Sequence, residues 1–166
     1  FPVLTSSVNV VYQLVHLYRH VFEGGIGLRQ LLDYYFALRV WHNDVMECKD
    51  LQSQGMWSEG LGTPVMSAEE VMAVLRSFGM GKFASAVMYV LQEVFAMPAL
   101  CYICEPNEKE GKKLLAEIMQ GGNFGQYDTR DAALKKGGMM KHGVWKLKRV
   151  MRLVRSYPEE ALWEPV

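Results

Sequence analysis

The sequence predicts an all-α protein: one helical domain spanning residues 1–166, a bundle of about six helices that begins with an antiparallel hairpin. Apolar residues recur every three to four positions in several segments, which is the period of an amphipathic helix. Glycines, prolines and capping residues stand at the ends of these segments. No pair of segments alternates β-branched and polar residues as the strands of a sheet would.

The first two predicted helices are joined by a short glycine turn. The hydroxyl residues at 5–7 are N-cap candidates for a helix whose apolar positions continue to Phe22. Glycines at 24–25 end that helix, and a second helix is expected from Gly27 to about Trp41. Because the turn is only a few residues long, we expect the two helices to pack as an antiparallel hairpin.

The middle of the chain predicts a loop followed by two more helices. Residues 42–66 show no sustained period; their first part is compatible with a helix and their second part is expected to be a loop. Ser67 and Glu70 have the spacing of a capping box, which predicts a helix from Ser67 to about Phe78. Another helix is expected over 82–95, where it ends before a proline.

The C-terminal third is expected to be helical and increasingly basic. The expected elements are a short apolar segment at 99–104, a polar-faced helix at 108–119, a polar segment at 129–138, a basic amphipathic helix at 144–157 and a last helical turn at 158–163.

The composition of the chain limits the classes of function that it can have. Half of the 166 residues are hydrophobic and the formal net charge is zero, which is typical of a packed domain and gives no overall attraction to nucleic acid. No apolar run has membrane-spanning length, and three cysteines make no disulfide framework, so we expect a cytoplasmic protein. The chain begins at Phe1 and ends just after Trp163 in apolar sequence, so we expect a piece of a larger protein.

Three polar residues on the first helix are candidate site residues. His16 and His20 are four apart and therefore share one helix face. Two such histidines can bind zinc, but the glutamate of an HExxH metalloprotease is absent and the neighbouring cation Arg19 disfavours a metal. The alternatives are a polar stripe on the helix or hydrogen bonds across the hairpin.

A second candidate pair lies at the start of the second helix. Arg29 and Asp33 are also four apart, and their apolar surroundings predict partial burial. Arg29 is expected in the first turn, where the helix dipole does not favour a cation. It therefore needs a compensating anion, which is either Asp33 or a group from elsewhere such as a phosphate.

Other motifs carry less chemistry. Cys101 and Cys104 form a CxxC pair without the second pair that a zinc site requires, so buried reduced thiols are the favoured interpretation over zinc or redox chemistry. The glycine-rich segment 121–128 lacks the lysine and spacing of a P-loop and follows a helix, so we interpret it as a C-cap and turn. We find no nucleophilic triad and no Asp-x-Asp metal pair.

The basic helix at 144–157 supports an alternative function. It is either a solvated face beside a core stripe or a surface that binds a phosphate backbone or an acidic protein. Its candidate contact residues are Lys146, Lys148, Arg149, Arg152 and Arg155.

Four segments together resemble the C-terminal part of the uncharacterised nucleotidyltransferase family, in the polymerase-beta-like superfamily. They span nearly the whole chain: His16-Leu-Tyr-Arg-His20, Gly27-Leu-Arg29-Gln-Leu-Leu-Asp33, Gly121-Gly-Asn-Phe-Gly-Gln-Tyr-Asp128 and Tyr157-Pro-Glu-Glu-Ala-Leu-Trp163.

The resemblance implies a helical accessory domain of an enzyme that transfers a nucleotidyl group from an NTP to an acceptor. The family's Gly-Ser turn and Asp-x-Asp metal pair belong to an N-terminal domain and are absent from this chain, which alone is expected to be inactive. Mg²⁺ and the NTP would bind that domain, which is also the expected partner. By the same analogy, Arg29 and Asp33 would contact nucleotide phosphate or hold the interdomain interface.

Overall fold

The computed structural model describes residues 4–54, 65–121, 144 and 151, and all the regular structure in them is helical. The elements are α1 (Ser6–Glu23), α2 (Leu28–Ser53), α3 (Ala68–Ser77), α4 (Gly81–Phe95), the 3₁₀ turn η1 (Ala99–Cys101) and α5 (Glu108–Gly121). The predicted all-α class is confirmed for these residues. The segments expected at 129–138 and 158–163 lie outside them, as does the basic helix apart from two positions.

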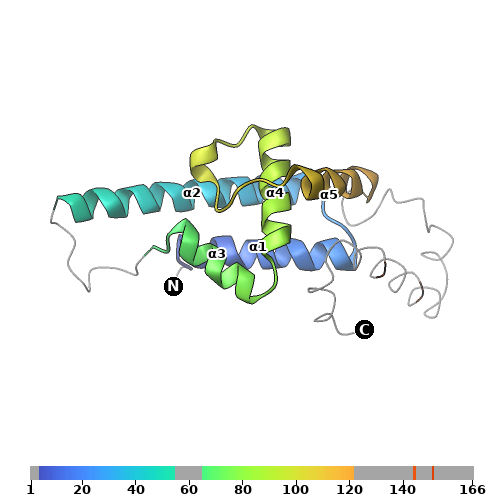
Figure 1. Cartoon of the computed structure of the whole chain (residues 1–166), viewed down its shortest axis with the longest axis horizontal. Helices are drawn as coiled ribbons and strands as arrows, with labels where there is room; N and C mark the ends of the chain where they lie inside the picture. Colours follow the sequence, from blue (N-terminus) through green and yellow to red (C-terminus); the bar gives the residue numbers. More distant parts are fainter. Residues whose placement is uncertain (1–3, 55–64, 122–143, 145–150, 152–166) are drawn as a thin grey trace.

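A glycine turn joins α1 to α2, and the two helices pack side by side (Figure 1). The amides of Gly24 and Gly25 both donate to the carbonyl of His20, at 3.0 and 2.7 Å, which closes the end of α1. Gly25 has φ 99°, a left-handed conformation that glycine adopts without steric cost. The amide of Gly27 then donates to Oε1 of Gln30 at 3.0 Å and opens α2.

Helix α2 is longer than the sequence pattern predicted. The expected end near Trp41 is wrong, since the helix continues to Ser53 and projects beyond the other helices (Figure 1). The first part of residues 42–66, which the sequence left compatible with a helix, is therefore helical. No glycine or proline occurs between Trp41 and Ser53, and extending an existing helix costs little compared with starting one. The apolar period fades there because few side chains on this part of α2 reach the core.

Helix α4 is the centre of the hydrophobic core. It crosses α1 and α2 and packs most extensively against α5 (Figure 1). It buries seven apolar side chains: Phe83, Ala84, Ala86, Val87, Met88, Val90 and Leu91. A helix that is apolar around most of its circumference must be covered on several sides, which explains why α1, α2, α3 and α5 surround it.

The start of α3 is fixed to both α1 and α2 through Met66. The buried hydroxyl of Ser7 accepts a hydrogen bond from the Met66 amide at 2.8 Å, and Nε1 of Trp41 donates to the Met66 carbonyl at 2.9 Å. The next residue begins the predicted capping box, which is confirmed: the Ser67 amide donates to Glu70 at 2.8 Å and the Glu70 amide donates to Ser67 at 3.3 Å.

Candidate functional site

The two histidines of α1 contact each other. Their Nε2 atoms are 3.0 Å apart, and the rings meet edge to face with centroids 4.3 Å apart. Tyr12, one turn earlier, stacks on His16 with centroids 5.9 Å apart. His16 is exposed and His20 is half-buried. At this distance one Nε2 donates and the other accepts, so the spacing of four residues produces a coupled imidazole pair at the surface.

Arg29 and Asp33 are presented to solvent. Both side chains are exposed, and no ion pair joins them. The partial burial expected from the apolar sequence around them is therefore wrong. The α2 side chains that enter the core are on other positions, including Leu31 and Tyr34, and water competes effectively for an exposed pair of charges. Arg19 on α1 is exposed as well.

Rows of exposed apolar side chains run along both α1 and α2, and the helical periodicity alone did not distinguish them from the positions that enter the core. On α2 they are Leu28 and Leu32, each 37% exposed, and Phe36 and Val40, each 55% exposed. On α1 they are Val8, Tyr12 and Val15, with exposures of 37–57%, and Leu4, just before the helix, is 59% exposed. The sequence does contain a sign of these exposed rows, because apolar residues occupy more of the circumference of each helix than one buried stripe needs.

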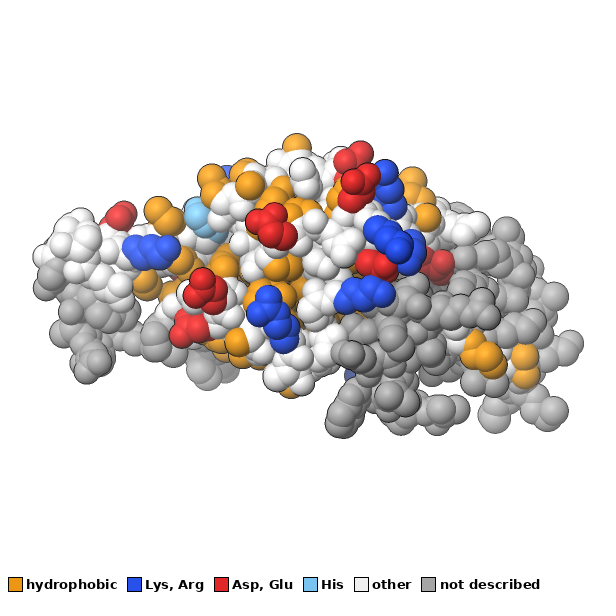
Figure 2. Space-filling view, in the orientation of Figure 1, with side chains coloured by type: hydrophobic (Ala, Val, Ile, Leu, Met, Phe, Trp, Pro, Cys, Tyr) orange, Lys and Arg blue, Asp and Glu red, His pale blue; other side chains and the backbone are white. Residues whose placement is uncertain are grey.

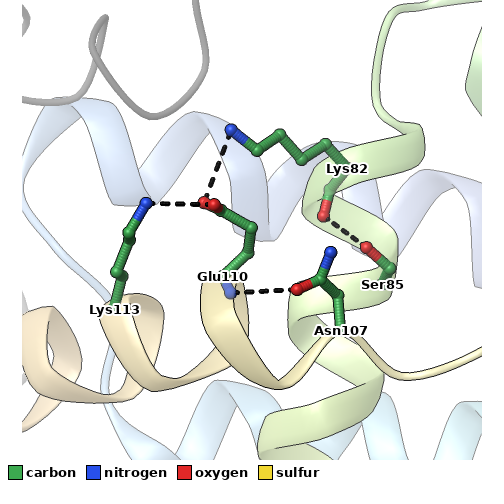
Figure 3. Close-up of polar contacts among 5 residues, drawn as sticks. All are labelled: Lys82, Ser85, Asn107, Glu110 and Lys113. Carbon is green, nitrogen blue, oxygen red and sulfur yellow. Dashed lines mark hydrogen bonds and ion pairs between the residues drawn. The ribbon is translucent and has the colours of Figure 1, made fainter.

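A buried carboxylate joins α4 to α5 (Figure 3). Glu110 is 8% exposed at its side chain; Nζ of Lys113 lies 3.0 Å from Oε1 and Nζ of Lys82 lies 3.4 Å from Oε2. The side-chain oxygen of Asn107 caps α5 by accepting a hydrogen bond from the backbone amide of Glu110 at 3.1 Å. The backbone amide of Asn107 donates to the Ser85 carbonyl at 3.0 Å. No feature of the sequence distinguished Glu110 from the other acids of this polar-faced helix.

The electrostatics of Glu110 suit a structural role. Burial raises the pKa of the carboxyl, but the hydrogen bond from Lys113 and the charge of Lys82 outweigh burial, so the net pKa is lowered. Beside it, the 105–109 segment lines an open depression of about 670 Å³. Basic and acidic side chains are interspersed on this face (Figure 2), so no single sign of charge marks it as a substrate site.

The cysteine pair is placed in the interior near η1. Cys101 is buried, Cys104 is half-buried, and both are free thiols. Burial raises the pKa of Cys104 to about 11 and also raises that of Cys101. Thiols with raised pKa values are poor nucleophiles and poor metal ligands. In the described ranges, no three histidine, cysteine or acidic residues are grouped to hold a metal ion.

The basic residues of the alternative function lie outside the described residues: Lys146, Lys148, Arg149, Arg152 and Arg155. Only Val144 and Met151 of that predicted helix are described, and both are exposed.

Comparison of the chain with protein-family models, curated proteins and solved structures found no match. None of the helices in the described part is both long enough and apolar enough to cross a membrane. A functional proposal for this chain therefore depends on its motifs and on the surfaces described above.

Proposed function

We propose that this chain is the helical accessory domain of a nucleotidyltransferase-like protein, and that it acts by packing against a preceding catalytic domain. The observation that supports this is the exposed row on α2, where Leu28, Leu32 and Phe36 lie beside the charges of Arg29 and Asp33. An apolar row with polar neighbours is the composition of a surface that is buried by another domain. The resemblance of the surrounding motif supplies the enzyme class.

In this proposal the catalytic domain carries the Gly-Ser turn, the Asp-x-Asp pair, Mg²⁺ and the NTP. The apolar row on α2 holds the two domains together and Arg29 contacts a nucleotide phosphate. Asp33, which forms no ion pair with Arg29 in the structure, orients it once the interface has formed. His16, Arg19 and His20 line the same interdomain surface. The full protein is cytoplasmic, and this domain forms a bundle of about six helices that begins with an antiparallel hairpin.

Titration of ATP and Mg²⁺ into the full-length protein and into this chain tests the proposal. We expect binding by the full-length protein and none by the chain alone, which lacks the metal pair. Arg29→Ala should weaken full-length binding by roughly 10- to 100-fold, since a charge-assisted hydrogen bond contributes about 1.5–3 kcal/mol. Phe36→Glu should weaken it by separating the domains, and Asp33→Ala should have a smaller effect.

Lys49→Ala is the matched control, because Lys49 is an exposed cation farther along the same helix. Full-length binding that is unchanged by Arg29→Ala and Asp33→Ala would contradict the proposed site. Binding of RNA by this chain alone, weakening steeply with salt, would instead favour the alternative interaction module built on the basic helix.

A further inference from the structure

The two histidines of α1 have the separation of two neighbouring ligands on one metal ion. A metal–imidazole bond of 2.0–2.1 Å places two nitrogens about 2.9 Å apart at a 90° angle and about 3.3 Å apart at the tetrahedral angle. The Nε2 atoms of His16 and His20, which share a hydrogen bond in the structure, are 3.0 Å apart and so lie within this range.

His16 opens one side of this pair to an ion, whereas His20 is half-buried beside it. His16 is exposed, and Tyr12 stacks on its ring and restricts its rotation. Arg19 is exposed, so water screens its charge. Each neutral imidazole carries one proton, and moving both protons to Nδ1 frees both Nε2 atoms without releasing a proton. The missing HExxH glutamate excludes a zinc-protease site but not a simple chelate.

We propose that His16 and His20 form a bidentate surface site for a divalent transition metal that imidazole binds well, Cu²⁺ or Ni²⁺. Imidazole is a suitable ligand for both ions, and Cu²⁺ binds more tightly in the usual order of affinities. The described residues supply no third grouped ligand, so water occupies the other positions. This site is a property of α1 and does not depend on a catalytic domain.

Calorimetric titration of this chain with Ni²⁺ tests the site; Ni²⁺ is chosen because free thiols reduce Cu²⁺. We expect one Ni²⁺ per chain, and a loss of roughly tenfold or more in affinity for His16→Gln or His20→Gln, because each removes one arm of the chelate. On the unmodified protein, substoichiometric Ni²⁺ should broaden the amide NMR signals of residues 12–20 selectively.

His42→Gln is the matched control: it removes a histidine from α2, and we expect it to leave the affinity unchanged. Equal Ni²⁺ affinity of the original chain and the His16→Gln, His20→Gln double variant would overturn the site. So would broadening centred on His42 or the chain terminus. Neither result bears on ATP binding by the full-length protein, so the two proposals fail separately.

Discussion

At the scale of single residues, contacts between glutamate and lysine have different effects on stability at the surface and in the interior. Glu108 and Lys112 lie only 2.6 Å apart, yet both are more than 60% exposed. Glu110 lies at similar distances from two lysines but is almost fully buried. Water screens the first pair, whereas the buried carboxylate depends on its partners, so we expect only Glu110 to matter for stability.

Replacing Glu110 with glutamine should lower the free energy of unfolding at pH 7 by about 1–2 kcal/mol, because both lysines lose a buried partner. The folded-state pKa of Glu110 is below its ordinary value of 4.5. The stabilisation is therefore complete above about pH 4.5 and is lost as the pH falls toward the folded-state pKa. Urea unfolding between pH 7 and pH 3 should show the difference between the two proteins narrowing.

Glu108→Gln is the control for this measurement, and it should change stability by no more than about 0.5 kcal/mol. If the difference between the Glu110 variant and the original protein were independent of pH, the carboxylate would not be charged and paired as the structure shows.

At the scale of elements, the close approach of α4 and α5 depends on a glycine. Gly111 is buried inside α5, and a Cβ atom built there would overlap Cβ, Cγ and Cδ1 of Tyr89 on α4. The backbone of α4 fixes the position of the Tyr89 Cβ atom, so rotation of the ring alone cannot remove the overlap. A helix-interior glycine costs about 1 kcal/mol relative to alanine, so its presence here indicates that contact between the helices outweighs helix propensity.

Gly111→Ala should therefore destabilise the protein by about 1–3 kcal/mol, although alanine is the better helix former. In a Tyr89→Gly background the same substitution should be neutral or stabilising, because all three overlapping atoms, the Cβ included, are absent. Thermal or urea unfolding of the four proteins of this double-mutant cycle gives the coupling directly. Additive effects would show that Tyr89 is not what confines Gly111.

Element boundaries show how far local sequence specifies this fold. The capping box of Ser67 and Glu70 and the glycine turn after α1 were predicted correctly, since each acts through neighbours in the chain. The end of α2 was not, because the overhang beyond Trp41 has neither a helix breaker nor an apolar stripe to mark it. Side-chain burial along α2 was also misjudged, because apolar spacing alone does not show which of two rows meets the core.

At the scale of the whole molecule, three distant segments meet at Met66. Its amide is bonded by Ser7 from the start of α1, and its carbonyl by Trp41 from α2. Each bond satisfies a backbone group that the end of a loop would otherwise expose or leave unpaired. Together they fix where α3 begins relative to the α1–α2 pair, and thereby how α3 covers α4.

Ser7→Ala should cost about 1–2 kcal/mol of stability, because the partly buried Met66 amide loses its acceptor. Amide hydrogen exchange should quicken at Met66 and at the start of α3 more than in α5. Ser77→Ala is the control, since that hydroxyl bonds only within its own helix and its loss should be nearly neutral. Unchanged exchange at Met66 in the Ser7 variant would contradict the role assigned to this contact.

The sequence by itself determined the helical class, most helix starts and the shared helix face of His16 and His20, because capping and four-residue spacing act within one or two turns. Only the tertiary structure decided the environment of Glu110, the exposure of Arg29 and Asp33, and the hydrogen bonds that Met66 forms with α1 and α2. These depend on which helix face meets another helix, and that is set by contacts between residues far apart in the chain.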